Sequence, residues 1–178
     1  LASVESAAGI SRMEAVDPTS LATASIDRFK PQARRAGVAV ILKSDEPPEI
    51  QGDTARLEQA IDNLISNAIK ATPEQGEIVV SVAPDGAFVN LAVTDSGPGI
   101  EPEHLPHVFE RFYRIDRARS SGNSNPGSGL GLAITRHIVE AHGGKADVES
   151  APGESTTFTL RLPVRPPLLQ MGVSENSD

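Results

Sequence analysis

Two glycine-rich turns bracket the middle of the chain and constrain its fold more than any other feature. The first covers residues 95–100 (DSGPGI) and the second residues 127–131 (GSGLG). Glycine permits positive φ and lets backbone amides approach a ligand without an intervening Cβ. Phosphate groups bind well at helix N-termini that follow such turns. The pair therefore suits a phosphate-bearing ligand held between the turns, although either turn alone is better explained as a surface loop.

The composition restricts the classes of protein to which the chain can belong. Its 178 residues suffice for one domain with a hydrophobic core. The formal net charge of −8 would repel a nucleic acid backbone and disfavours that partner. The absence of cysteine excludes disulfides and thiol chemistry, and makes the cytoplasm the default compartment. The longest apolar run, residues 38–42, is far shorter than the roughly 20 residues that span a bilayer.

The first half of the chain predicts two amphipathic helices and two short strands. The first helix covers residues 17–36, with Pro31 either kinking it or ending it early. The second covers residues 53–71 and begins at an aspartate cap. Residues 38–42 have the β-branched content of a buried strand, and residues 49–51 are expected to form a short edge strand.

The helix over residues 53–71 has one apolar face and one polar face. Asn63, Asn67 and Lys70 stand at i, i+4 and i+7, within roughly 60° of one another on the helix circumference. Asn67 lies nearest the edge of the apolar stripe. The stripe consists of Leu57, Ala60, Ile61, Leu64, Ile65, Ala68 and Ile69.

The second half of the chain predicts two hairpins and two helices. Strands 77–82 and 87–94 are joined by a Pro-Asp-Gly turn, and the second strand delivers Asp95 at its end. Residues 101–108 predict a short helix, and residues 115–128 predict a mobile loop because they lack apolar periodicity. The remaining expected elements are a helix from Gly129 or Gly131 to about residue 141 and a final hairpin of strands 145–149 and 156–162.

Four motifs in this order resemble those of the ATP-binding catalytic domain of bacterial sensor histidine kinases. Residues 64–70 resemble the N box, 95–100 the G1 box, 109–114 the F box and 127–134 the G2 box. The resemblance covers about residues 18–162. It implies the α+β Bergerat (GHKL) fold, a two-layer α/β sandwich in which three helices cover one face of a mixed, mostly antiparallel sheet.

The resemblance also implies a domain organisation and a reaction. Residues 1–16 would be the end of a dimerisation helix and its linker, and 17–163 the ATP-binding domain. The proline-rich and then polar composition of residues 164–178 predicts a disordered tail. The domain would bind Mg-ATP and donate the γ-phosphoryl to a histidine on an upstream dimerisation domain. A response regulator aspartate would then receive it. The full-length protein is expected to be a homodimer anchored in the inner membrane, with this domain in the cytoplasm.

The chemistry of each side chain suits a role in nucleotide binding. Asn67 offers a neutral oxygen to Mg2+ among phosphate charges. Asp95 at a strand end accepts a hydrogen bond from the adenine 6-amino group, which selects adenine over guanine. Lys70 and Arg114 would meet phosphate charge, with Arg114 resembling the family's γ-phosphate contact. Taken alone, Asn67 would be a satisfied amide, Asp95 part of a plain turn and Lys70 a solvated lysine.

The predicted site comprises three catalytic residues, one metal ligand and a wider nucleotide-binding set. Asn63, Lys70 and Arg114 are predicted as catalytic, and Asn67 as the Mg2+ ligand. The nucleotide-binding set is Asn63, Asn67, Lys70, Asp95, Gly97, Gly99, Ile100, Tyr113, Arg114, Gly127, Ser128, Gly129, Leu130 and Gly131.

Two further expectations concern aromatic residues near the nucleotide. Phe109 and Phe112 are predicted to pack as a hydrophobic hinge that anchors a lid over residues 115–128. Ala71 stands where the family often has an aromatic residue beside the nucleotide, so stacking there is absent and the affinity should be modest.

The phosphoacceptor is expected outside this fragment. None of the four histidines lies in the His-Glu-x-x-x-Pro-like context of family phosphoacceptors, so the fragment should bind ATP without efficient autophosphorylation. The four are His104, His107, His137 and His142.

Two alternative functions remain open. The first is an ATPase of the gyrase, MutL or heat-shock chaperone type, in which a glutamate one turn before the metal asparagine activates water. Asn63 occupies that position and cannot act as a general base. The second is an ATP-binding-only module or a serine-directed kinase, which residues 109–114 disfavour because that block is typical of histidine kinases.

Overall fold

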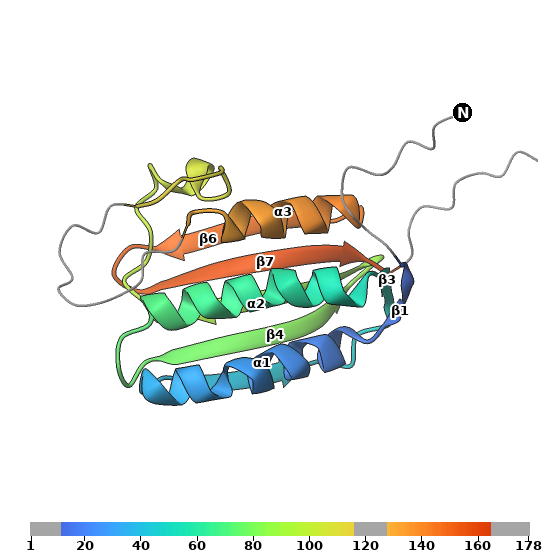
Figure 1. Ribbon diagram of the computed structural model, residues 1–178, viewed down its shortest axis with the longest axis horizontal. Coiled ribbons are helices and arrows are strands. Elements are labelled where there is room, and N and C mark those ends of the chain that lie inside the picture. Colours follow the sequence, from blue (N-terminus) through green and yellow to red (C-terminus); the bar gives the residue numbers. More distant parts are fainter. Residues whose placement is uncertain (1–11, 116–127, 165–178) are drawn as a thin grey trace, which may run out of the picture.

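The computed structural model describes residues 12–115 and 128–164 and has two layers. Three helices lie side by side on one face of a five-stranded sheet (Figure 1). This confirms the predicted α+β sandwich. In chain order the elements are β1 (Glu14–Val16), α1 (Pro18–Arg35), β2 (Ala39–Ser44), β3 (Ile50–Gly52), α2 (Thr54–Ala71), β4 (Glu77–Asp85), β5 (Phe88–Asp95), the 3-10 helix η1 (Leu105–His107), α3 (Gly131–Ala141), β6 (Lys145–Ala151) and β7 (Ser155–Pro163).

The main sheet has the strand order β2-β4-β5-β7-β6. β2 runs parallel to β4, and the other neighbouring pairs are antiparallel. The sheet is therefore mixed and mostly antiparallel, as predicted. In this register Asp95 is paired with Ile78 on one side and with Thr156 on the other. The end of the central strand β5 consequently lies between two neighbours rather than at an open edge.

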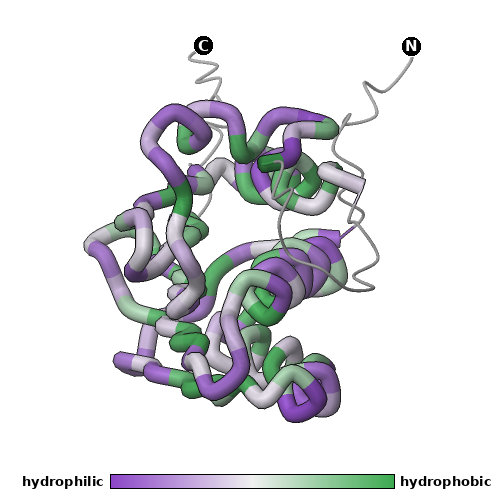
Figure 2. The backbone as a smooth tube through the Cα atoms, turned by 90° about the vertical axis from the view of Figure 1, so that its left-hand side faces the viewer, coloured by the Kyte–Doolittle hydropathy of each residue, from purple (hydrophilic) through white to green (hydrophobic). Residues whose placement is uncertain are grey.

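The hydrophobic core fills the space between the sheet and the helices. Alternate residues of β4, β5 and β7 are buried, which is the two-residue period of a sheet with one covered face. Figure 2 shows hydrophobic and hydrophilic residues alternating along the backbone. The largest fully buried side chains are Ile50, Leu57, Ile61, Leu64, Ile65, Ile78, Leu91, Leu160, Val80, Val82, Val89 and Val93.

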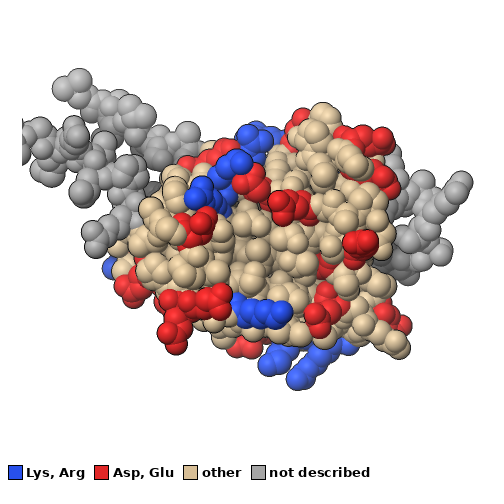
Figure 3. Space-filling view, turned by 180° about the vertical axis from the view of Figure 1, so that it is seen from behind, with Lys and Arg blue, Asp and Glu red and all other residues tan. Residues whose placement is uncertain are grey.

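The other face of the sheet has no helix over it in the described part of the chain. Seen from behind, its middle is formed by uncharged residues and its rim by charged ones (Figure 3). On this face the hydroxyls of Thr94 in β5 and Thr157 in β7 form a hydrogen bond, with their oxygens 2.9 Å apart. At one end the Arg161 guanidinium lies 4.0 Å from the Phe88 ring centroid and is 3.0 Å from Asp85 Oδ2. These contacts pair several of the polar side chains on this face with one another, although Asn90 Oδ1 is buried there without a hydrogen-bond partner among the described residues.

Helix α1 begins at Asp17 and continues past Pro31. The Asp17 carboxylate accepts hydrogen bonds from the backbone N–H groups of Thr19 (3.0 Å) and Ser20 (3.3 Å). Pro31 is exposed on the solvent side, while Ala33 beyond it is buried against the core. Packing of that buried residue keeps the helix intact to Arg35, so Pro31 does not end it early.

Helix α1 is also tied to α2 by one arginine. The Arg28 guanidinium is 2.7 Å from Glu58 Oε2 and is paired with Asp62. Hydrogen bonds with Glu58 and then Asp62 raise the pKa of Arg28 above its ordinary value. These contacts hold the two helices in register on the sheet.

Three local predictions differ from the structure. Strand β1 was not predicted, and β3 pairs with it in a separate two-stranded sheet instead of lying at the edge of the main one. The helix predicted over residues 101–108 is wrong, because only the 3-10 turn η1 forms there. Its hydrogen bonds run from His104 N to Glu101 O and from His107 N to His104 O. Pro106 lacks the N–H that would bond to the carbonyl of residue 102 in an α-helix, whereas Pro102 would stand in the first turn, where proline is tolerated.

Candidate functional site

Helix α2 forms one side of the candidate site. The Asp53 carboxylate caps it by accepting from Arg56 N at 3.2 Å, and the predicted apolar stripe is buried. On the polar face Asn63 and Asn67 are half-buried and Lys70 is exposed. Residues 63, 67 and 70 therefore share a partly solvated face beside the core, as their spacing predicts.

Asp95 lies buried at the end of β5. The residue is 4% exposed, and its Oδ1 accepts a hydrogen bond from Gly97 N at 2.9 Å. A Cβ on Gly97 would be 2.9 Å from Ala71 O, so the first glycine turn packs against the last residue of α2. This contact brings Asp95 and the end of α2 together.

The first glycine turn also rests on the β6–β7 hairpin. Ile100 N donates to Ser150 Oγ at 2.8 Å, and Gly153 N donates to Pro98 O at 2.7 Å. Gly99 has φ of 72°, and a Cβ there would lie 2.3 Å from Ala151 O. A side chain at residue 99 is thus excluded by both conformation and space.

The block at residues 109–114 only partly matches its prediction. Phe109 packs edge-on against Phe158 with ring centroids 5.9 Å apart, which confirms its place in the core. Phe112 is 70% exposed, so its predicted packing is wrong. The reason is its positive φ of 65°, which directs the side chain outward while its N–H donates to Gly129 O at 2.9 Å. The Tyr113 hydroxyl is 2.7 Å from His104 Nδ1, and Arg114 is exposed.

The second glycine turn leads into α3 and meets α2. Ser128 is exposed, and Leu130 occupies the N-cap position of α3 without any side-chain cap. Gly129 has φ of 71°, with a virtual Cβ 2.9 Å from Phe112 Cα. The helix starts at Gly131, whose virtual Cβ would be 3.5 Å from Asn63 Cγ. Of the two predicted start positions, residue 131 is confirmed.

These contacts connect three of the predicted motifs around the C-terminal half of α2. Gly97 meets Ala71, Gly131 meets Asn63, and Phe112 meets Gly129. Gly127 and most of the predicted lid, residues 116–127, lie outside the described residues. The same is true of residues 1–11 and of the tail from residue 165.

Three polar residues at the site were missed by sequence reasoning. Ser150 supports the first glycine turn, and Thr156 is buried directly across from Asp95, with its hydroxyl 2.9 Å from Ser150 Oγ. Thr135 is fully buried between α2 and α3. Only Thr135 had a detectable signal, since it follows Gly131 by one helical turn on the apolar face of α3.

A metal ion here would have to be held by few protein ligands. Within residues 12–115 and 128–164, no group of three His, Cys, Asp or Glu side chains could hold a metal ion. Asn67 offers one neutral oxygen donor, and Lys70 one turn away would attract phosphate. This donor set fits Mg2+ that arrives already bound to phosphates, which needs only one or two protein ligands.

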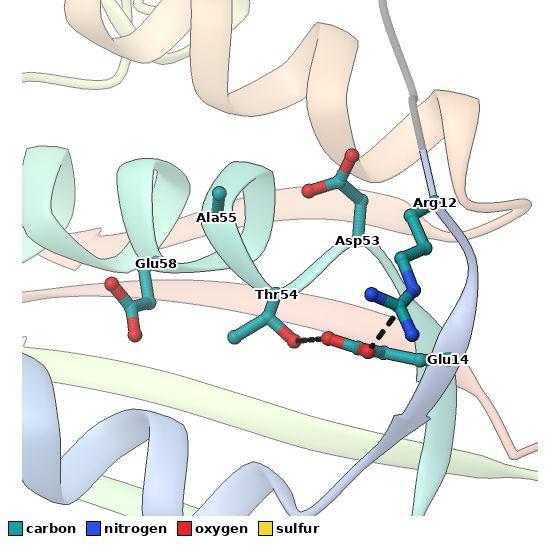
Figure 4. A pocket seen from close by; sticks show the side chains of 6 residues that line it. All are labelled: Arg12, Glu14, Asp53, Thr54, Ala55 and Glu58. Carbon is teal, nitrogen blue, oxygen red and sulfur yellow. Dashed lines mark hydrogen bonds and ion pairs between the residues drawn. The ribbon is translucent and has the colours of Figure 1, made fainter.

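A separate pocket of about 420 Å³ lies at the start of α2, away from this site. Figure 4 shows Thr54 and Arg12 both directed at the Glu14 carboxylate, with distances of 2.7 Å and 3.7 Å. Because these groups satisfy one another and the pocket is open, it does not compete with the glycine-turn site as a functional centre.

The family to which the chain belongs follows from its sequence. Residues 52–166 match HATPase_c, described as histidine kinase-, DNA gyrase B-, and HSP90-like ATPase. The chain belongs to this family, and within it resembles the catalytic domains of sensor histidine kinases.

Individual relatives agree in both sequence and structure. The sensor-like histidine kinase SenX3 of Mycobacterium tuberculosis is 41% identical over 163 residues, which is 92% of this chain and 39% of SenX3. A nucleotide-free catalytic domain of histidine kinase ThkA has a TM-score of 0.76 at 27% identity, covering 88% of this chain and all of that domain. The mycobacterial sensor histidine kinase MprB has a TM-score of 0.74 at 34% identity, covering 87% of this chain and 99% of the MprB chain. The chain thus spans about two fifths of SenX3.

No helix among the described residues is both long enough and apolar enough to cross a bilayer.

Proposed function

We propose that this chain binds Mg-ATP between α2, the first glycine turn and the start of α3, and donates the γ-phosphoryl to a histidine of a dimerisation domain of the same protein. The observation that carries the proposal is the meeting of Gly97 with Ala71 and of Gly131 with Asn63. In the reaction an imidazole nitrogen forms a bond to the γ-phosphorus. The bond from that phosphorus to the β–γ bridging oxygen breaks, and ADP leaves.

In this proposal Asp95, Lys70 and Arg114 contact the nucleotide, and Asn63 lines the same face of α2 and is hydrogen-bonded to Gly131 O. Asp95 accepts from the adenine amino group, because its buried carboxylate lies at the mouth of a turn with little side-chain bulk. Lys70 and Arg114 neutralise phosphate charge from exposed positions. The uncapped amides at the start of α3 bind phosphate oxygens.

The metal and the remaining residues complete the site. Asn67 would hold Mg2+, which supplies positive charge to the phosphates when bound. The other proposed contacts are Ile100, Tyr113, Gly127, Ser128, Leu130 and the glycines of both turns, as the sequence predicts.

The buried His142 is unsuited to accept the phosphoryl group, which agrees with an acceptor outside this chain. His142 Nδ1 donates to Ile138 O at 2.7 Å, and Nε2 accepts from Asp53 N at 3.0 Å. Both ring nitrogens are therefore occupied in a buried side chain. His107 Nδ1 pairs with Glu110 at 2.8 Å, and His104 Nδ1 pairs with Tyr113.

We also propose that a response regulator receives the phosphoryl group after the histidine. ThkA, which resembles this chain with a TM-score of 0.71 and 26% identity in that structure, was solved in complex with the response regulator protein TrrA. The homodimer, the linker role of residues 1–16, the tail at 164–178 and anchoring of the full protein in the membrane belong to the same proposal.

ATP hydrolysis is the weaker alternative. Asn63 Nδ2 donates to Gly131 O at 3.0 Å, and an amide cannot remove a proton from water near neutral pH. Residue 63 therefore lacks the base that a water-activating ATPase requires.

Transfer to a separately produced dimerisation domain tests the proposed function. The chain is mixed with that domain, Mg2+ and γ-labelled ATP, and with a control domain whose candidate histidine is replaced by alanine. We expect label on the intact dimerisation domain, stable in base and labile in acid. Release of free phosphate at the same rate with and without that domain, and no protein label, would indicate an ATPase instead.

A further inference from the structure

A polar contact interrupts the apolar interface between α2 and α3. Asn63 Nδ2 donates to Gly131 O at 3.0 Å and lies 3.3 Å from Thr135 Oγ1. Thr135 Oγ1 in turn donates to Ala60 O at 3.3 Å. Thr135 is 0% exposed, whereas Asn63 is half-buried at the edge of the site. We call Asn63, Thr135 and the carbonyls of Gly131 and Ala60 the α2–α3 latch.

The chemistry of the latch fixes its direction. A backbone carbonyl only accepts, so the nitrogen of the Asn63 amide must face Gly131 O. The Thr135 hydroxyl gives its one proton to Ala60 O and accepts the amide with a lone pair. A donor is therefore required at residue 63. A carboxylate there would face an oxygen acceptor and could not replace the amide.

The start of α3 depends on support from outside the helix. Asp17 caps α1 and Asp53 caps α2 through their side chains, but Leu130 gives α3 no side-chain cap. The first amides of α3 are thus left available for a ligand, while the position of its first turn must be set by other contacts. The latch supplies such a contact, because Asn63 donates a hydrogen bond to the carbonyl of Gly131, the first residue of the helix.

We infer that Asn63 and Thr135 are positioning residues that hold the first turn of α3 at the correct place beside α2 for nucleotide phosphates. Both act through Gly131, and Thr135 does so without access to the ligand. This inference rests on the proposed nucleotide site. It assigns Asn63 a structural task as a hydrogen-bond donor, and it adds a buried residue, Thr135, to the set that determines affinity.

The test uses two conservative changes at Thr135, with ADP affinity measured by calorimetry and the melting temperature measured in parallel. Thr135→Val keeps the volume but removes the hydroxyl, and should weaken ADP binding by roughly fivefold to tenfold, the scale of one lost hydrogen bond. Thr135→Ser keeps the hydroxyl and should bind within about twofold of wild type. Val139→Ala, a buried change on the same helix outside the latch, should lower the melting temperature without changing ADP affinity.

A double variant provides a check that does not depend on one substitution. Asn63→Ala should weaken binding as well, and adding Thr135→Val should cost little more, because the two side chains form one unit.

The inference would be overturned if Thr135→Val bound ADP as tightly as wild type. The inference would also be overturned if the effects of Asn63→Ala and Thr135→Val on ADP affinity were fully additive, or if Val139→Ala lost as much ADP affinity as Thr135→Val. If Thr135→Val does not fold, Thr135→Ala, which also removes the hydroxyl, replaces it both as the single variant and in the pair with Asn63→Ala. Wild type that binds no ADP would instead overturn the proposed function.

Discussion

At the scale of single residues, the glycines of the second turn should respond differently to the same substitution. Gly129 has φ of 71° and no space for a Cβ, which would lie 2.9 Å from Phe112 Cα. Gly129→Ala should lower the free energy of unfolding by about 1–2 kcal/mol, the cost of a left-handed L-residue.

Gly131 begins a helix, and its Cβ would make an ordinary 3.5 Å contact. Gly131→Ala should leave stability unchanged or raise it by up to about 1 kcal/mol. Urea denaturation of both variants measures this; equal losses would contradict the assignment of residue 129 as the constrained position.

The proposed metal ligand gives a second test at this scale. Asn67→Ala should remove the Mg2+-dependent part of ATP binding while the circular dichroism spectrum stays unchanged, because the side chain is only half-buried. Ser66→Ala, its half-buried neighbour on α2, is the matched control. Calorimetry with and without Mg2+ separates the two parts of the affinity. An Asn67→Ala variant that keeps the full Mg2+ effect would rule out this ligand.

Single residues also show where sequence reasoning stops. Asn67 and Lys70 could be placed on one helical face because α-helix geometry fixes their spacing. The outward turn of Phe112 could not, since it depends on a backbone hydrogen bond to Gly129, 17 positions away. The burial of Thr156 beside Asp95 likewise depends on strand register, which a single strand does not encode.

At the scale of elements, the cap of α1 predicts how stability changes with pH. Hydrogen bonding from the Ser20 hydroxyl, more than the backbone amides, lowers the pKa of Asp17 below its ordinary value of 3.8. A carboxylate with a lowered folded pKa stabilises the fold above its unfolded pKa and loses that effect as pH falls through the folded value. Asp17→Ala should therefore cost about 1 kcal/mol of unfolding free energy at pH 7.

The same cost should persist down to about pH 5 and shrink only below the ordinary value of 3.8. Denaturation curves at several pH values provide the measurement. Asp27→Ala, an exposed acidic position on the same helix, should cost much less at every pH. A cost for Asp17→Ala that grows on acidification would contradict the sign of the lowered pKa.

The elements differ in how well the sequence predicts them. Helix α2 was placed to within one residue because an N-cap, an apolar stripe and a terminating proline all agree. Strand β1, with three residues, is too short to show a period, and it is stabilised by pairing with β3 and by burial of Val16. No α-helix forms over residues 101–108 because Pro106 would fall in its interior and has no N–H to donate.

At the scale of the whole molecule, the site is assembled by contacts between distant segments. Ile100 is supported by Ser150, and Asn63 holds Gly131, at sequence separations of 50 and 68 residues. Motif spacing along the chain predicted which segments take part, but not the contacts that fix their distances. The contact of Ile100 with Ser150 requires the sheet order that places β7 beside β5 and β6 beside β7.

Base selectivity measures the central claim most directly, because it asks whether the assembled site recognises an adenine nucleotide through Asp95. Calorimetry should show wild type binding ADP at least about tenfold more tightly than GDP. Asp95→Asn should weaken ADP binding by roughly 1 to 3 kcal/mol. Asp85→Asn, the same change at the far end of the β4–β5 hairpin, should leave it unchanged. Equal affinity of wild type for ADP and GDP would contradict the account.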